Sequence, residues 1–232
     1  MKTDNTLNYK KGEMITVDIT DFGENGEGIG KTDAFTWFIK DTVIGDKVMA
    51  KVMKTKKSYG YARLESIVKE SKDRVEAKCP VARSCGGCTL QSLDYKAELR
   101  LKQNKVENHL KRIGGFDLSS VEIEEIIGME DPIRYRNKSQ FPFGRKNGKN
   151  ITGYFAGRTH SIVEFDDCII GIGENKTVLN TVLDFMEKYS VEAYNEEDGS
   201  GIVRHVLIRK GFATGELMVC IVINANNLPH SD

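Results

Sequence analysis

Three of the five cysteines in this chain fall within ten residues, in the segment CPVARSCGGCTL at 79–90. Cys79, Cys85 and Cys88 have the spacing C-x5-C-x2-C, and two glycines separate the last pair. A cluster of thiols of this kind serves as a disulfide framework, a zinc site, an iron–sulfur site or a catalytic nucleophile. Most of these uses tie distant parts of a chain together, so the choice among them constrains both fold and function.

The compartment and the scattered histidines narrow this choice. The N-terminus MKTDNTLNYKKGE lacks the apolar core of a signal peptide, and no apolar run approaches the roughly 18 residues of a membrane span. We therefore expect a cytoplasmic protein with no membrane partner, in which thiols stay reduced and a disulfide is disfavoured. A catalytic thiol is also disfavoured, because no histidine lies near the three cysteines in sequence to activate one.

A metal site with four thiolates needs one more cysteine, either Cys168 or Cys220. Cys220 lies in an apolar run, where we expect a buried thiol that packs as a small hydrophobic side chain. Cys168 follows two aspartates at the end of an expected strand, so we favour it as the fourth ligand. Zinc sites usually present two close pairs of ligands, whereas iron–sulfur clusters accept three clustered ligands and a distant fourth. The spacing favours a cluster over zinc, and redox or disulfide use remains a lesser alternative.

Short strands are expected throughout residues 12–68. Alternating or aromatic runs at 14–20, 35–39, 47–53 and 59–68 are separated by turns rich in Gly, Asp and Asn. This spacing predicts a small all-β barrel, and we place a first domain at 1–70. The glycine loop GENGEGIGKT at 23–32 resembles a phosphate-binding loop, but Asn25 stands where that motif needs glycine, and a strand-like run follows instead of a helix. We interpret it as a hairpin loop.

Residues 71–232 are expected to form a second, α+β domain with a mostly antiparallel sheet. The apolar spacing predicts a basic amphipathic helix at 92–113, with Ser92 as its N-cap and Gly114-Gly115 at its end. A second helix is expected near 174–189. Strands are expected at 121–127, 138–143, 153–156, 161–165, 203–210 and 216–223. The apolar face of the first helix could dock on another domain or support self-association.

Charge is distributed unevenly along the chain, although the net charge is zero. Residues 40–115, which surround the three clustered cysteines, carry 18 positive and 9 negative charges, whereas residues 116–200 carry 9 positive and 16 negative charges. An asymmetry of this kind suggests a polyanion as partner for the basic part. A solvated basic face without a partner is the alternative that composition leaves open.

The segment CPVARSCGGCTLQSLDYKAELRLKQNKV closely resembles the cysteine segment of the RNA uracil-5-methyltransferase family of the 23S ribosomal RNA type. In that family Cys-Pro, a short spacer and Cys-Gly-Gly-Cys precede Leu-Gln and a helix rich in Tyr and Lys. Three further segments are similar to the family, namely YRNKSQFP at 135–142, GYFAGRTHSIVEFDDC at 153–168 and IVRHVLIRKG at 202–211. The resemblance extends over essentially the whole chain.

The resemblance implies a TRAM domain, a small barrel of the oligonucleotide-binding type, at residues 12–68. It also implies that a [4Fe–4S] cluster is held by Cys79, Cys85, Cys88 and Cys168. The family uses S-adenosylmethionine to methylate C5 of a uridine, with a cysteine nucleophile and a carboxylate base in a C-terminal Rossmann-type domain. We find no counterpart of that domain, since Gly171-Ile172-Gly173-Glu174-Asn175-Lys176 begins a G-x-G-x-x-G pattern but ends on lysine.

We therefore assign no catalytic residue and expect these residues to be the N-terminal half of such an enzyme, inactive alone and without the S-adenosylmethionine site. The implied partner is RNA, with ribosomal RNA favoured. The expected RNA-binding residues are Lys51, Lys54, Arg134, Arg136, Lys138, Arg158 and His160. Phe22, Phe35, Trp37, Lys56 and Lys57 are further candidates on the barrel. The alternative function is a stand-alone zinc or iron–sulfur RNA-binding module without catalysis.

Overall fold

The computed structural model describes residues 9–230, which divide into two compact units. The first unit contains the chain up to Ala77 together with 89–128, and the second contains 78–88 together with the chain from Met129 onward. The sequence analysis placed the boundary between the two domains near residue 70. The segment 89–128, expected in the second domain, clusters with the barrel instead.

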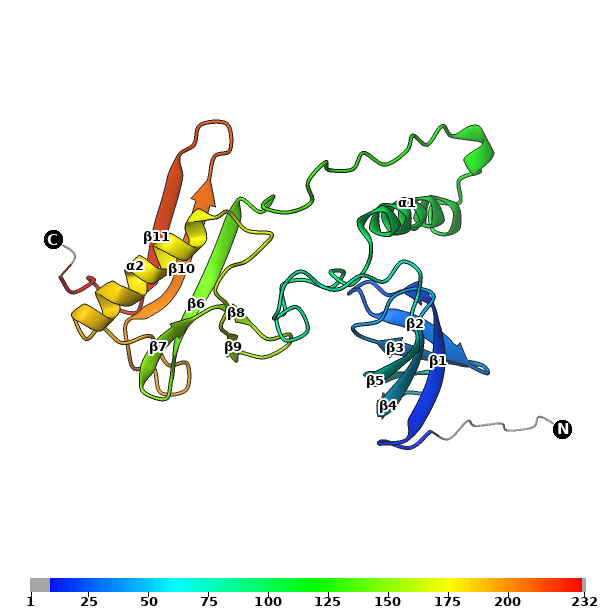
Figure 1. The fold of residues 1–232 in the computed structure, drawn as a ribbon, viewed down its shortest axis with the longest axis horizontal. Helices are drawn as coiled ribbons and strands as arrows, with labels where there is room; N and C mark the ends of the chain where they lie inside the picture. The colour runs from blue at the N-terminus through cyan, green and yellow to red at the C-terminus, as the bar shows by residue number, and fades with distance from the viewer. Residues whose placement is uncertain (1–8, 231–232) are drawn as a thin grey trace. The chain divides into compact units, whose positions relative to one another are not determined.

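Five strands close into a barrel in the first unit (Figure 1), in the order β1-β2-β3-β5-β4. Neighbouring strands are antiparallel except β3 and β5, which are parallel. The strands are β1 (Met14–Phe22), β2 (Gly28–Thr32), β3 (Phe35–Ile39), β4 (Lys47–Thr55) and β5 (Tyr59–Lys69). The small all-β barrel expected from the sequence is confirmed.

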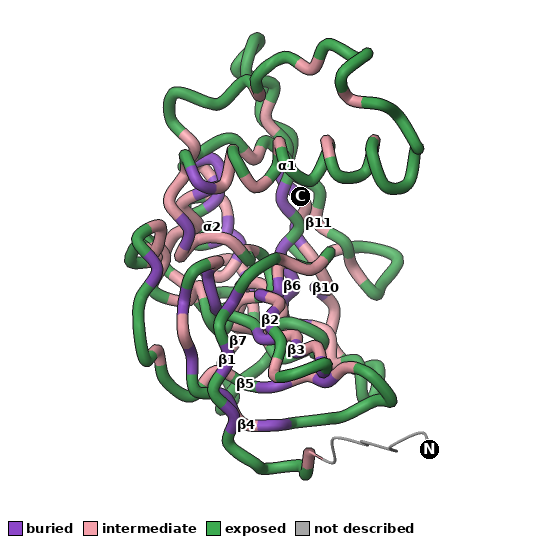
Figure 2. The backbone as a smooth tube through the Cα atoms, turned by 90° about the vertical axis from the view of Figure 1, so that its right-hand side faces the viewer, coloured by how far each residue is buried: buried purple, intermediate pink, exposed green. Residues whose placement is uncertain are grey.

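The alternation of buried and exposed residues along the strands explains how the barrel core forms. Every second residue of β1 from Ile15 to Ile19 is buried, and Trp37 of β3 is fully buried. Figure 2 shows such buried stretches along the barrel strands. Gly30 of β2 lies so close to β1 that a Cβ there would fall 2.3 Å from the Asp18 carbonyl oxygen. Residues 28–32 of the expected hairpin loop thus form β2, where glycine at position 30 is needed for strand packing.

The first helix, α1 (Tyr95–Arg112), begins later than expected. Its N-cap is Asp94, whose carboxylate accepts hydrogen bonds from the backbone N–H groups of Lys96 and Ala97 at 3.0 and 3.3 Å. Ser92 is therefore not the cap. Ala97 and Leu93 pack with Val43 of the barrel unit, so this end of the helix docks on the barrel.

The prediction of a strand at 121–127 is wrong. These residues are extended but form no ladder, and Ile127 is 94% exposed. Alternating apolar residues satisfy the local pattern of a strand, but a strand needs a neighbour to accept its hydrogen bonds. The short 3₁₀ helix η1 (Leu118–Ser120) precedes this segment.

The second unit is built on an antiparallel sheet with the order β11-β10-β6-β7, and a separate pair of strands, β8-β9, completes it. The helix α2 (Glu174–Lys188) lies across one face of the sheet (Figure 1). The strands are β6 (Lys138–Lys146), β7 (Lys149–Thr152), β8 (Tyr154–Phe155), β9 (Ile162–Val163), β10 (Val203–Lys210) and β11 (Leu217–Ile223). The mostly antiparallel α+β fold is confirmed.

The core of this unit lies between α2 and the sheet. Leu179 and Met186 of the helix pack with Phe141 of β6 and with Val206 and Ile208 of β10. The edge strand β11 differs from expectation, because its apolar run is largely exposed and Cys220 is exposed with it. An apolar run resembles a buried strand in sequence, whereas burial depends on what covers it in space. No helix in the described part of the chain is both long and apolar enough to cross a membrane.

Candidate cluster site and RNA-binding surfaces

The cysteine segment is held in the second unit by the strand pair β8-β9. A turn places the N–H of Cys85 2.8 Å from the carbonyl of Val81, and Cys85 then forms an antiparallel bridge with Ala156. The N–H of Gly86 donates to the carbonyl of Phe155 at 3.0 Å. These contacts fix the loop on which Cys85 and Cys88 lie.

The two glycines between Cys85 and Cys88 have different roles. A Cβ on Gly86 would fall 2.8 Å from the Phe155 carbonyl oxygen, so only glycine permits this close approach of the two backbones. The N–H of Gly87 donates to Cys85 Sγ at 3.3 Å. Backbone donors of this kind stabilise a thiolate, which is the ligand form of cysteine.

The structure brings Cys168 to the three clustered cysteines. Burial raises the pKa of Cys85, the Gly87 N–H lowers it, and the neighbouring thiols of Cys88, Cys168 and Cys79 raise it further. The thiols of Cys79, Cys88 and Cys168 therefore each lie within electrostatic range of Cys85. Each is half-buried, and none of the chain's cysteines forms a disulfide.

The four thiols do not converge as ligands of a single ion. In the part of the chain that the structure describes, no group of three or more Cys, His, Asp or Glu side chains has the arrangement that holds a metal ion. A zinc ion needs its thiolates about 2.3 Å from one centre. The structure therefore places Cys79, Cys88 and Cys168 near Cys85 but shows no formed metal site among the described residues.

Arg134, an expected RNA-binding residue, also stabilises the chain around Cys168. Its guanidinium pairs with the Asp167 carboxylate and donates to the carbonyl oxygens of Cys168 and Gly171 at 3.0 and 3.1 Å. The hydrogen bond from Arg134 lowers the pKa of Asp167. The positive φ of Arg134, 54°, indicates that tertiary contacts impose this conformation.

Several buried polar atoms lie near Cys168 without a hydrogen-bond partner among the described residues. They are both amide atoms of Asn175, the hydroxyl of Ser139 and the hydroxyl of Tyr154. Asn175 is 3% exposed and Ser139 is 4% exposed. Gly171 separates Asn175 from Cys168, since a Cβ on Gly171 would lie 2.7 Å from Asn175 Nδ2 and 3.7 Å from Cys168 Cβ. Burial raises the pKa of Tyr154, and the nearby Cys168 thiol raises it further.

The barrel has three aromatic rings on its outer surface. Phe38 of β3 lies 5.8 Å from Tyr59 and 5.6 Å from Tyr61 of β5, measured between ring centroids, and the two tyrosines are 5.9 Å apart. All three are half-buried, and they alternate with the buried residues Trp37 and Ala62. We call them the aromatic platform.

The aromatic candidates of the sequence analysis lie mostly elsewhere. Phe35 is 5% exposed and Trp37 is fully buried, so both belong to the core and not to an RNA surface. Side chains of a barrel strand alternate between the core and the outer surface, and on β3 Phe38 lies on the outer surface. The tyrosines of the platform were missed, although the alternation Tyr-Gly-Tyr-Ala at 59–62 is a signal that could have found them.

The remaining expected RNA-binding residues are divided between the two units. Lys51 and Lys54 lie on the outside of the barrel, where Lys54 pairs in register with Tyr61. Lys138, Arg158 and His160 are exposed in the second unit, and Arg136 is half-buried. Lys54 adjoins the aromatic platform, whereas Arg158 and His160 lie on the turn between β8 and β9.

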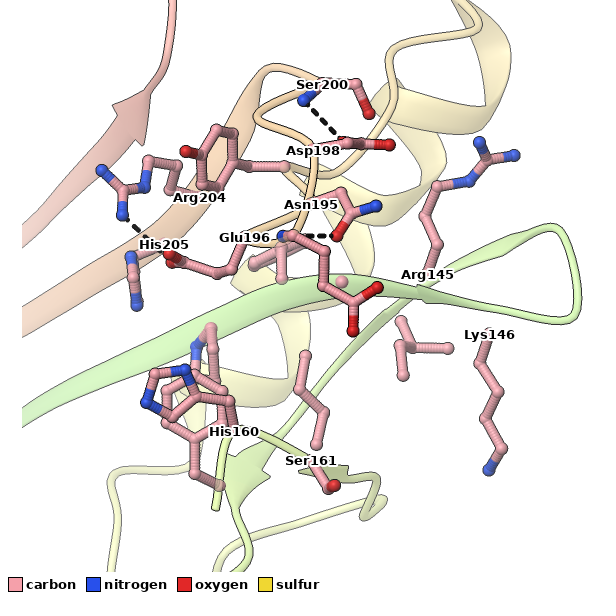
Figure 3. A pocket seen from close by; sticks show the side chains of 18 of the residues that line it. Arg145, Lys146, His160, Ser161, Asn195, Glu196, Asp198, Ser200, Arg204 and His205 are labelled. Atoms are coloured by element: carbon pink, nitrogen blue, oxygen red, sulfur yellow. Dashed lines mark hydrogen bonds and ion pairs between the residues drawn. The ribbon is translucent and has the colours of Figure 1, made fainter. Parts of the chain in front are cut away.

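The second unit also contains a groove that sequence reasoning missed. It is lined by the β6-β7 hairpin, the β8-β9 turn, the segment 194–200 and the start of β10, and it encloses about 820 Å³ (Figure 3). Its residues are scattered over four segments, so no local pattern pointed to it. His160 alone among the expected RNA-binding residues lines this groove.

Comparison with known proteins agrees with the barrel and with the overall fold. Residues 9–64 match the TRAM domain family. An uncharacterized RNA methyltransferase of Clostridium acetobutylicum is 46% identical over 95% of this chain and 48% of its own length. Another, from Listeria monocytogenes, is 41% identical over 96% of this chain and 49% of its own length.

Among solved structures, a Pyrococcus abyssi tRNA (uracil-54, C5)-methyltransferase in complex with S-adenosyl-L-homocysteine is similar in fold, with a TM-score of 0.67 and 24% identity. The match covers 92% of this chain and 47% of that protein. The chain thus contains a TRAM domain and resembles proteins named RNA methyltransferases along nearly its whole length. It spans about half the length of the curated relatives that it matches.

Proposed function

We propose that this chain is the RNA-binding, cluster-bearing part of a cytoplasmic, S-adenosylmethionine-dependent RNA uracil-5-methyltransferase. The names of the relatives support RNA methylation, and the fold neighbour's uracil specificity and bound S-adenosyl-L-homocysteine support the base and the cofactor. We propose 23S ribosomal RNA as the substrate, because the cysteine segment resembles that branch of the family. The neighbour acts on tRNA, so methylation assays of the whole protein should offer both RNAs.

The aromatic platform is the observation that carries RNA binding. Unpaired bases stack on aromatic side chains, and barrels of the oligonucleotide-binding type use such rings together with a basic groove for the backbone. Phe38, Tyr59 and Tyr61 supply the rings, and the adjoining Lys54 supplies positive charge beside Tyr61. The arrangement suits single-stranded or loop RNA better than a duplex, because bases in a duplex are already stacked.

Replacement of the two tyrosines tests this proposal. We expect Tyr59→Ala with Tyr61→Ala to weaken binding of a short single-stranded RNA roughly tenfold or more, since each stacked base contributes about 1–3 kcal/mol. Fluorescence anisotropy measures the affinity. Phe212→Ala provides the control, because Phe212 is a 57% exposed aromatic residue on the turn between β10 and β11 and not part of the barrel. Equal losses in both variants would contradict the platform.

The cluster is the second part of the proposal. Cys79, Cys85, Cys88 and Cys168 would hold a [4Fe–4S] group, which when bound would supply a structural cross-link between the cysteine segment and the loop after β9. The unpartnered amide of Asn175 supports this interpretation, because hydrogen-bond donors near ligand sulfurs are common around such groups. No electron transfer is required for methyl transfer from S-adenosylmethionine, so a structural role is favoured.

Metal analysis distinguishes the cluster from the alternatives. We expect anaerobically purified protein to be brown, to absorb near 400 nm and to contain about four iron atoms per chain. Cys168→Ser should abolish the colour, whereas Cys220→Ser should retain it, because Cys220 is exposed on β11. Colourless protein with one zinc ion per chain would overturn the cluster and favour a zinc-bearing RNA-binding module.

A further inference from the structure

The groove of the second unit has the size of a small-ligand site. Its volume of about 820 Å³ falls within the roughly 300–1,000 Å³ of typical ligand pockets. Figure 3 shows side chains from separate segments around it, with His160 and Ser161 on one side and Asn195 to Ser200 on another. A ligand in this groove would therefore contact several strands and loops at once.

Two flat pairs of side chains form part of the wall. The His160 ring stacks on Phe155 with centroids 5.3 Å apart and planes inclined by 24°. The Arg204 guanidinium lies over the Tyr194 ring, 4.4 Å from its centroid. His160 is exposed, so it presents its ring to the groove while Phe155 supports it. Planar surfaces of this kind accept planar ligands.

The positive charges of the groove are already compensated. Arg145 pairs with Glu192 at 2.7 Å, Lys146 with Glu164 at 3.1 Å and Arg204 with Glu196 at 3.0 Å. Further carboxylates line the groove at Glu197 and Asp198. The groove therefore offers little attraction for a phosphate group, and its carboxylates would repel an acidic peptide.

A neutral hydrogen-bonding group remains on the same wall. Burial lowers the pKa of His205, and the charge of Arg204 lowers it further, so its imidazole is neutral near pH 7 and offers both a donor and an acceptor.

We propose that this groove binds one unstacked nucleobase of an RNA, stacked on His160 and hydrogen-bonded along its edge by His205. The inference rests on the proposed RNA-binding function and adds a second contact point to the aromatic platform. A nucleobase is the ligand that needs flat faces and edge hydrogen bonds but no net positive charge. The phosphates of the same strand would stay outside the groove.

Crosslinking and binding measurements on the whole chain test this inference. A single-stranded RNA with scattered 4-thiouridines is bound, irradiated and digested, and mass spectrometry locates the crosslinks. We expect crosslinks in the peptides that contain His160 or Tyr194. We also expect His160→Ala to weaken binding about fivefold or more, as for one lost stacked base, without changing the slope of affinity against salt concentration.

Matched variants separate the possible outcomes. His109→Ala removes another exposed imidazole, in the first unit, and should bind RNA as the wild type does. Lys54→Ala should reduce the salt slope, because a lysine contacts phosphate. If the wild type binds no RNA, the proposed function fails as well. Three results would overturn only the groove inference while the wild type still binds RNA. His160→Ala could bind RNA as tightly as the wild type, or it could change the slope of affinity against salt concentration. The third such result is that no crosslink maps to the groove.

Discussion

Arg74 donates to Asp46 through two nitrogens, with Nη2 2.6 Å from Oδ2 and Nε 3.1 Å from Oδ1. The Asp46 side chain is completely buried, and its carboxylate also accepts the backbone N–H groups of Val43 and Ser71 at 2.7 and 2.9 Å. One carboxylate thus ties the turn before β4 to the chain that leaves β5. We expect Asp46→Asn to destabilise the protein by about 3 kcal/mol, because it leaves the Arg74 charge without its partner. Urea unfolding of the whole chain measures this loss.

An exposed pair provides the control for this prediction. Lys47 and Asp18 are 3.4 Å apart on the barrel surface, with side chains 44% and 68% exposed. Asp18→Asn should change the free energy of unfolding by less than about 1 kcal/mol, since exposed ion pairs contribute little. If Asp46→Asn and Asp18→Asn had equal effects, the buried pair would not stabilise the first unit.

The same carboxylate predicts a pH dependence of stability. Burial alone would raise the pKa of Asp46, but the hydrogen bonds from Arg74, Ser71 and Val43 outweigh it, and the pKa is lowered. A lowered folded-state pKa stabilises the protein above the unfolded value of about 3.9, and this stability is lost as the pH falls through the folded value. The difference in stability between wild type and Asp46→Asn should therefore be constant near neutrality and shrink below about pH 4. A difference that stays constant down to pH 2 would contradict the shift.

Trp37, the chain's single tryptophan, should behave as a core residue in fluorescence. It is fully buried, and its Nε1 donates to Thr32 Oγ1 at 2.7 Å. We expect emission at short wavelength, weak quenching by acrylamide and no direct quenching by bound RNA. Strong acrylamide quenching in the folded protein would contradict the buried position. The platform tyrosines serve as the comparison, because RNA should protect them from chemical nitration.

The strands predicted most accurately from the sequence are those in which the residue pattern favours a strand and the fold supplies neighbouring strands to pair with it. The bounds of β3, Phe35–Ile39, and of β10, Val203–Lys210, match the expected ranges, because each strand has a neighbour on both sides. The segment 121–127 has an equally good alternation but forms no ladder. The burial of β11 was overestimated for a related reason. An apolar sequence does not reveal whether another element covers either face of the strand.

Prediction of the candidate sites from the sequence is limited in the same way, because a local pattern does not show which distant residues meet in the fold. The spacing of Cys79, Cys85 and Cys88 identified three neighbouring thiols, because those residues are close in sequence. Spacing could only favour Cys168 over Cys220 as the fourth thiol, since the approach of Cys168 depends on how β8 and β9 lie against the cysteine segment. The groove depends wholly on tertiary structure, because Tyr194 and His160 meet only after the sheet has formed.

Asn175 should affect the proposed cluster and the metal-free protein in opposite directions. Its amide is buried without a partner among the described residues, which costs stability when nothing accepts or donates to it. We expect Asn175→Leu to leave the metal-free protein unchanged or more stable by about 1 kcal/mol. In protein that carries the proposed cluster the same change would remove a donor close to Cys168, and iron should be retained about tenfold less tightly, as for other outer partners of metal ligands.

Iron release to a chelator, followed by absorbance near 400 nm, measures the loaded form, and thermal unfolding measures the metal-free form. Asn180→Leu is the matched control, because Asn180 lies on the same helix but is exposed. It should leave iron release unchanged. If Asn175→Leu destabilised the metal-free protein and released iron at the wild-type rate, Asn175 would be a packing residue of α2 with no influence on the cluster.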